Sequence, residues 1–148
     1  SILQGYVHDM GAAMQGGIGG HAGLFSNSND VAKIMQMFLQ GGYYGGKRFF
    51  KNSTIKYFNT CYFCDSNNRR GIGFDKPQLD DSKSTCGCVP MTSFGHSGFT
   101  GTYAWADPEN NIVYVFLSNR TFPTMNNNLL SKHNIRTEIQ KIIYESFN

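Results

Sequence analysis

FGHSGFTGTYAWADPENNIVYVFLSNR, residues Phe94–Arg120, carries the signals that decide the fold of this 148-residue chain. Near its end, Val113–Leu117 is an unbroken apolar run rich in β-branched and aromatic residues, which is typical of a strand buried on both faces. Asp107–Asn111 precedes that run and combines a proline with two asparagines, the composition of a tight turn. The segment before the turn is polar and rich in glycine. We therefore predict a hairpin of two antiparallel strands.

Two glycines flank the dipeptide His96–Ser97 in the first predicted strand. Because glycine has no Cβ, Gly95 and Gly98 allow a ligand or another backbone to come close to the strand at this point. The dipeptide brings an imidazole and a hydroxyl to the same place. The polar strand is therefore predicted to form the wall of a site.

Two separate runs resemble one family. GHSGFTGTYAWADPE at Gly95–Glu109, followed by LSNR at Leu117–Arg120, resembles the C-terminal portion of serine hydrolases related to class C β-lactamases and penicillin-binding proteins. In that superfamily the strand that lines the active site carries Lys-Thr-Gly or, in many esterase-like members, His-x-Gly, and His96–Gly98 would occupy that place. GYVHDMGAAMQGGIGGHAGLFSNSNDVAKIMQMFLQGG at Gly5–Gly42 resembles the Gly-rich loop, "AGLFS" sequence and helix of the same family.

The resemblance implies an α+β fold in which flanking helices cover an antiparallel sheet, as in the C-terminal portion of a β-lactamase/transpeptidase-like domain. A length of 148 residues suits one domain with a sizeable core. The implied chemistry is attack of a serine on a carbonyl carbon, followed by hydrolysis of the acyl-enzyme. The implied substrates are esters, amides or peptidoglycan-type molecules, and the resembled enzymes are commonly periplasmic or exposed on the cell surface.

The resemblance also implies roles for single residues. His96 would stand in for the family's lysine and hydrogen-bond the substrate carboxylate or the catalytic tyrosine, with the Ser97 hydroxyl serving the same end and Gly98 completing the triplet. The backbone N–H of Phe99 would be one of two oxyanion donors. A His in place of Lys favours esterase- or peptidase-like specificity over β-lactam hydrolysis, because a permanent positive charge is lost near neutral pH.

Substrate contacts are predicted for His21 and Gly101. His21 lies in a segment with six glycines, Gly11–Gly23, which the resemblance places near the active-site cleft. A structural role within the loop is the alternative for His21. The loop has neither the Walker ending nor a GxGxxG pattern after a strand, so no phosphate-binding loop and no cofactor are predicted.

The family's Ser-x-x-Lys nucleophile and its Tyr-x-Asn or Ser-x-Asn element belong well upstream of the matched region. We therefore expect residues 1–148 to be a fragment that lacks the N-terminal part and is inactive without it as a partner. One formal Ser-x-x-Lys occurs at Ser53–Lys56, after the Gly-rich loop, where we expect an ordinary helix start. The alternative is a non-catalytic binding or interaction module. The surface that normally faces the missing half would be an exposed apolar patch, which is expected to drive self-association or partner binding.

Composition narrows the function classes. Apolar residues make up 40% of the chain and aromatic residues 14%, which argues against disorder. The net charge is only +3, and Lys47–Arg48 and Arg69–Arg70 are isolated basic pairs, so nucleic-acid binding is not predicted. No apolar run approaches the roughly 18–20 residues that span a bilayer.

Four cysteines form two close pairs, Cys61–Cys64 and Cys86–Cys88. Free thiols, one or two disulfides, and a zinc site all remain open. The single residue within the second pair is a poor match to zinc-site spacing, so no metal site is predicted.

The remaining elements follow from caps and periodicity. Apolar residues at helical spacing predict helices, which we place at Val31–Leu39 after caps in Ser26–Asp30, at Asn52–Thr60 and at Leu129–Phe147. Short strands are predicted at Lys47–Phe50 and Gly71–Asp75. Pro77–Pro90 is a long excursion, which we predict to form part of the cleft rim.

Overall fold

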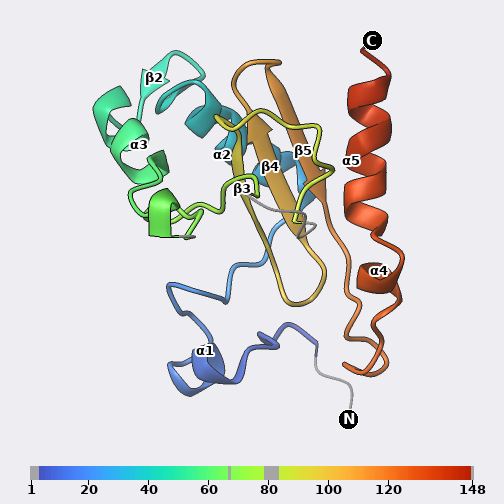
Figure 1. The fold of residues 1–148 in the computed structure, drawn as a ribbon. Helices are drawn as coiled ribbons and strands as arrows, with labels where there is room; N and C mark the ends of the chain where they lie inside the picture. Colours follow the sequence, from blue (N-terminus) through green and yellow to red (C-terminus); the bar gives the residue numbers. More distant parts are fainter. Residues whose placement is uncertain (1–3, 67, 79–83, 148) are drawn as a thin grey trace.

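The computed structural model of the chain describes residues 4–66, 68–78 and 84–147. Its centre is an antiparallel sheet of β3 (Phe94–Ser97), β4 (Tyr103–Asp107) and β5 (Ile112–Phe116), in the order β3-β4-β5. Helix α2 (Ser28–Leu39) packs on one face and α5 (Ile135–Glu145) lies along the other (Figure 1). The predicted α+β fold, an antiparallel sheet with flanking helices, is confirmed.

Both faces of the sheet are covered, which explains the unbroken apolar run of β5. Successive side chains of a strand point to opposite faces. On β5, Val113 packs with the α2 side and Tyr114 with the α5 side. On β4, Ala106 and Trp105 divide in the same way. A strand between two helical layers needs apolar residues at every position, as the sequence indicated.

The central segment contains three strands and not the predicted two. A turn interrupts the first predicted strand after Ser97, and the chain resumes as β4 at Tyr103. Gly101 has a φ of +99°, a conformation that glycine adopts without steric cost and that closes this turn. The predicted turn at 107–111 is present and joins β4 to β5, with Asn111 at a positive φ of 55°.

Helix α2 begins where the cap residues predicted. The Asn27 side chain accepts a hydrogen bond from the Asp30 N–H at 3.0 Å, and Asp30 adds a negative charge at the helix N-terminus. Met35 is buried, and Phe38 packs beside it. Ile34, which was expected on the same apolar face, is 44% exposed.

The remaining elements are short. They are α1 (Met10–Met14), β1 (Tyr43–Tyr44), β2 (Lys47–Arg48), α3 (Asn52–Asn59), the 3-10 turn η1 (Cys64–Ser66) and α4 (Leu129–Lys132). Strands β1 and β2 pair across Gly45 and Gly46, both with positive φ, as a two-residue hairpin of type I′ requires. Helix α1 was not predicted, because four of its five residues lie within the glycine-rich segment.

Two predicted elements are wrong in detail. Gly71–Asp75 forms no strand; Asp75 makes one antiparallel bridge to Gly95 and the ladder stops there. Pro77, with no N–H to donate, follows two residues later. The last helix is divided into α4 and α5, because Asn134 adopts a left-handed φ of 52° between them, a conformation that asparagine tolerates.

Each cysteine pair forms a disulfide of its own, Cys61 with Cys64 and Cys86 with Cys88. Within the described ranges no group of three or more His, Cys, Asp or Glu side chains could hold a metal ion. No helix in the described part of the chain is long and apolar enough to cross a membrane. The Pro77–Pro90 excursion lies partly outside the described residues.

Candidate active-site strand

His96 lies on the exposed half of β3, opposite Ala104 of β4. Its Nδ1 lies 2.8 Å from the carbonyl oxygen of Ser97. Because a carbonyl only accepts, Nδ1 carries the hydrogen and donates it. The Nε2 atom of the neutral ring is then left with a lone pair. The strand therefore presents a solvent-accessible hydrogen-bond acceptor at this position.

His96 and Ser97 point to opposite faces of the sheet. Residues directly opposite each other on antiparallel strands share a face. His96 pairs with Ala104, which packs on the α2 side, whereas Ser97 pairs with Tyr103, which packs on the α5 side. The two side chains do not converge, and Ser97 meets His96 through its carbonyl oxygen.

The glycine before the dipeptide is explained by packing. A Cβ on Gly95 would lie 2.2 Å from the Ala104 oxygen and 2.4 Å from Cε3 of Trp105. Trp105 is 2% exposed and donates its indole N–H to the Ser93 hydroxyl at 2.9 Å. The close approach predicted at Gly95 is therefore made by the neighbouring strand. The glycine lets Trp105 pack flat against β3.

A tight turn follows the triplet and orients the Phe99 N–H. The Gly101 N–H donates to the Gly98 oxygen at 3.0 Å, which closes a four-residue β-turn. In a trans peptide the N–H points away from the preceding C=O. Since the Gly98 oxygen points into the turn, the Phe99 N–H points out of it. Among the residues that the structure describes, no acceptor bonds to this N–H.

The side chain of Phe99 brings together residues that are distant in the sequence. Phe99 is 63% exposed, and its ring stacks on His8 with centroids 5.6 Å apart and has its centroid 4.4 Å from the Arg120 guanidinium carbon. Neither His8 nor Arg120 was predicted as a site residue. Arg120 had one indication, since it ends the LSNR run, but no spacing in the sequence connects His8 to the turn.

His21 is held within its own loop. Its Nε2 lies 2.8 Å from Oδ1 of Asp9, which also accepts the Ala12 N–H at 2.8 Å and so caps α1. The Ala12 N–H and the His21 ring hold the pKa of the Asp9 carboxyl below its ordinary value. No described contact joins His21 to the His96 strand, so its predicted substrate contact stays a prediction.

Gly101 is buried at the end of the turn. A Cβ at this position would lie 2.3 Å from the Ser118 hydroxyl and 2.7 Å from Cδ2 of Leu130. The absence of a side chain therefore allows the turn to pack against the segment after β5. Its predicted substrate contact is untested.

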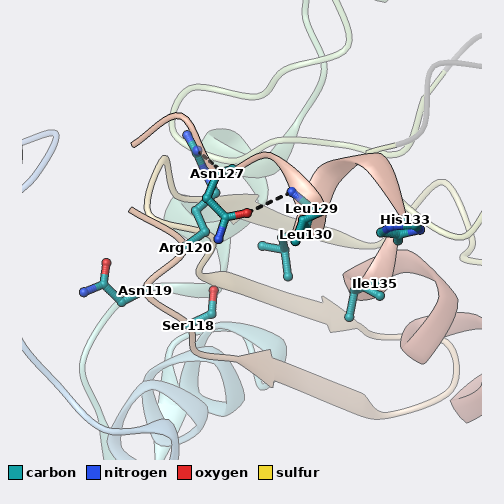
Figure 2. Close-up of a pocket in the computed structure, with 8 residues that line it drawn as sticks. All are labelled: Ser118, Asn119, Arg120, Asn127, Leu129, Leu130, His133 and Ile135. Carbon is teal, nitrogen blue, oxygen red and sulfur yellow. Dashed lines mark hydrogen bonds between the residues drawn. The ribbon is translucent and has the colours of Figure 1, made fainter. Parts of the chain in front are cut away.

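Two open cavities of about 310 Å³ lie beside the turn, and His96 lines neither of them. One is lined by His8, Asp9, Met10, Gly11, Phe99 and Met125. The other lies between the end of β5 and helices α4 and α5; Figure 2 shows its lining residues. The first cavity has Phe99 in its lining and is the better placed for a ligand of the strand.

The formal Ser-x-x-Lys lies in the first turns of α3. The side chains of Ser53 and Lys56 are exposed, and no hydrogen bond joins them in the described part of the chain. The helix start predicted here is therefore confirmed, one residue before Ser53.

The family model described as "Beta-lactamase" matches residues 3–135. The chain therefore belongs to the β-lactamase family and carries a serine-hydrolase-like domain. A similar protein is a "Putative D-alanyl-D-alanine carboxypeptidase" of Escherichia coli strain K12, 42% identical over 123 residues, which are 81% of this chain and 28% of that protein. A protein of the same name from Salmonella typhi is 39% identical over 81% of this chain and 28% of its own length. The chain thus spans less than a third of these relatives.

Proposed function

We propose that this chain is the C-terminal part of a β-lactamase-like serine hydrolase, and that it supplies the His96–Gly98 strand to a site whose nucleophile lies outside residues 1–148. The observation that carries the proposal is the exposed end of β3. There Nε2 of His96, which has no partner among the described residues, and the outward N–H of Phe99 occur three residues apart, at the end of a strand packed against the buried Trp105.

In the proposed reaction, a serine hydroxyl from the complementing part attacks the substrate carbonyl carbon. The oxyanion that forms accepts the Phe99 N–H as one of its two hydrogen bonds. Collapse of this intermediate expels the leaving group, which takes up the proton that the serine hydroxyl gave up, and water then hydrolyses the acyl-enzyme and regenerates the serine. His96 orients the catalytic tyrosine, whose hydroxyl donates to Nε2, and Ser97 fixes the imidazole tautomer through its carbonyl oxygen.

We propose a substrate of the peptidoglycan type, a peptide that ends in D-alanyl-D-alanine, because that is the substrate in the names of the relatives. Residues 1–148 alone are proposed to be inactive, since the exposed Ser53 lacks a base within hydrogen-bonding reach in the described ranges.

A non-catalytic binding module is the second candidate. It is favoured by the large apolar side chains exposed along the N-terminal segment, where Met14 is 88% exposed, Ile18 84% and Leu24 81%. Such a surface suits a protein partner or a second copy of the chain. Both candidates place a partner on this chain, but only the first requires covalent chemistry.

The test is labelling by a fluorophosphonate, read by intact mass and peptide mapping, of the folded chain alone and of the chain with the segment encoded upstream in the same reading frame. The chain alone is expected to form no adduct. The chain with the upstream segment is expected to form a stoichiometric adduct on the serine of an upstream Ser-x-x-Lys. Adduct on Ser53 would overturn the proposal. An upstream sequence without Ser-x-x-Lys, or a complemented protein that is never labelled, would favour the binding module.

The role of His96 is tested in the complemented protein with His96→Asn, and His133→Asn is the matched control. Both histidines are exposed, but His133 ends α4 and lies away from the strand. Release of D-alanine from a D-alanyl-D-alanine peptide is expected to fall at least 10-fold for His96→Asn only. Equal activity of the two variants would remove His96 from the site.

A further inference from the structure

Arg120 holds the turn that carries the Phe99 N–H. Its Nε–H donates to the Phe99 carbonyl oxygen at 2.7 Å, and its backbone N–H donates to the Thr100 oxygen at 2.9 Å. Two successive carbonyls of the turn are therefore fixed by one residue. The first of these bonds is short for an N–H donor, as charge-assisted bonds are.

The same guanidinium is anchored on its other side. Its Nη1 donates to the Met125 oxygen at 3.2 Å and to the Asn127 oxygen at 3.0 Å, and Figure 2 shows Arg120 beside Asn127. The guanidinium plane also lies over the Phe99 ring. Arg120 thus ties the turn to the segment that leads into α4, and the turn cannot shift without breaking these bonds.

This arrangement determines where the Phe99 N–H points. The peptide plane before Phe99 is fixed by the bond from Gly101 to the Gly98 oxygen, and the plane after it by Arg120. The two planes share the Phe99 Cα, so fixing both sets the backbone dihedrals of Phe99. The Phe99 N–H itself lies in the first plane. Without the Arg120 side chain the second plane loses its charged donor, the turn loosens as a whole, and the first plane with its N–H is held less firmly in one direction.

Direct binding of substrate by Arg120 is the competing role. The guanidinium has five N–H donors, and the donors on Nε and Nη1 are occupied by three main-chain carbonyls. Arg120 is also partly buried. This pattern favours an internal brace over an anion-binding group.

We infer that Arg120 is a positioning residue of the proposed oxyanion site: its side chain holds the Gly98–Gly101 turn so that the Phe99 N–H points at the reacting carbonyl oxygen. The inference rests on the proposed function for its catalytic purpose. Its conformational part, the bracing of the Phe99 amide, is independent of activity and is measured separately.

Arg120→Met and Arg48→Met are compared in the 148-residue chain by amide ¹⁵N relaxation. Arg48 is a matched control, because it also donates to two main-chain oxygens, those of Gly41 and Phe50, and lies over the ring of Tyr43. The order parameter of the Phe99 amide is expected to fall from about 0.85 to below about 0.6 only in Arg120→Met. An unchanged order parameter of the Phe99 amide in a folded Arg120→Met protein would show that Arg120 does not hold the turn.

The catalytic part is measured in the complemented protein with a D-alanyl-D-alanine peptide. For Arg120→Met we expect kcat to fall about 10–100-fold with KM within about 3-fold, because a misdirected donor weakens the transition state more than ground-state binding. Arg120→Lys, which keeps one charged donor, should recover part of the loss. Arg48→Met should keep the wild-type kcat.

A rise in KM at constant kcat would assign Arg120 to substrate binding and overturn positioning. Equal losses of kcat in Arg120→Met and Arg48→Met would show that Arg120 contributes only to general stability. If the wild-type complemented protein never releases D-alanine, the proposed function fails. The relaxation result then still decides whether Arg120 braces the turn, while its catalytic purpose is overturned.

Discussion

At the residue scale, Lys76 shows how burial changes the chemistry of one side chain. It is 6% exposed, and its ammonium donates to the Asn59 side-chain oxygen and to the Thr92 carbonyl, both at 3.1 Å. The ring of Phe94 lies 5.9 Å from the ammonium. Lys76 therefore fastens α3 to the start of β3. Burial lowers the pKa of Lys76 to about 8, because a charged ammonium is costly to desolvate.

This pKa predicts a pH-dependent stability. Between about pH 8 and the ordinary lysine pKa of 10.5, the unfolded chain keeps a proton that folded Lys76 has lost, so the free energy of unfolding rises with pH. Over about pH 8 to 9.5 the rise should be about 1–2 kcal/mol, measured by urea denaturation. In Lys76→Met this rise in the free energy of unfolding with pH should disappear.

Lys132→Met is the control, because Lys132 is an exposed lysine of α4 and should leave the slope unchanged. The measurement stays below about pH 9.5, because burial raises the pKa values of Tyr103 and Tyr144 and their phenols give the opposite slope at higher pH. A wild-type slope that persists in Lys76→Met would contradict the assignment.

At the element scale, α5 is attached to the β4–β5 turn through a buried carboxylate. Asp107 is 1% exposed and ends β4. One of its oxygens accepts the backbone N–H groups of Glu109 and Asn110, at 2.9 and 3.1 Å, which shapes the turn. The other accepts from the Asn110 amide and from the Tyr144 hydroxyl of α5. The carboxylate joins strand, turn and helix.

Tyr144→Phe should therefore weaken the attachment of α5 to the β4–β5 turn, because it removes the hydrogen bond to Asp107. A hydrogen bond to a charged group contributes about 1.5–3 kcal/mol, so the free energy of unfolding should fall by about that amount in urea denaturation. Tyr57→Phe removes an exposed hydroxyl from α3 and should change stability by less than about 0.5 kcal/mol. Similar values for the two variants would show that the bond to Asp107 is not stabilising.

At the scale of the whole molecule, the sheet separates two hydrophobic clusters. On the α2 side, Met35, Phe94 and Ala106 are buried together. On the α5 side the buried residues are aromatic, with Trp105 at the centre and Ile139 of α5 packed against them. Side chains on opposite faces of a sheet share no contacts, so the clusters should contribute independently to stability.

Independence predicts additive mutations. Met35→Ala should cost about 2–5 kcal/mol and Ile139→Val about 0.5–1.5 kcal/mol, and the double variant should equal their sum within about 0.5 kcal/mol. Met35→Ala with Phe94→Leu is the control within one cluster, where a coupling of about 0.5–3 kcal/mol is expected. Denaturant titrations of the five variants provide the values. Strong coupling across the sheet would contradict two separate layers.

The sequence by itself determined the features that depend on neighbouring residues. Hydrophobic periodicity and the Asn27 cap placed α2, the apolar run placed β5, and Asp107–Asn111 placed the turn between β4 and β5. The α+β fold and the family also followed from the sequence, because the Gly95–Glu109 run is itself contiguous. Each of these signals acts over a few residues, where spacing along the chain is spacing in space.

Only the tertiary structure decided which distant groups meet. It divided the long C-terminal helix at Asn134 and reduced Gly71–Asp75 to one bridge. It also placed His8 and Arg120 on the ring of Phe99. These contacts depend on how turns close and helices pack after the strands have formed, and no local pattern encodes the distance between segments so far apart in the chain.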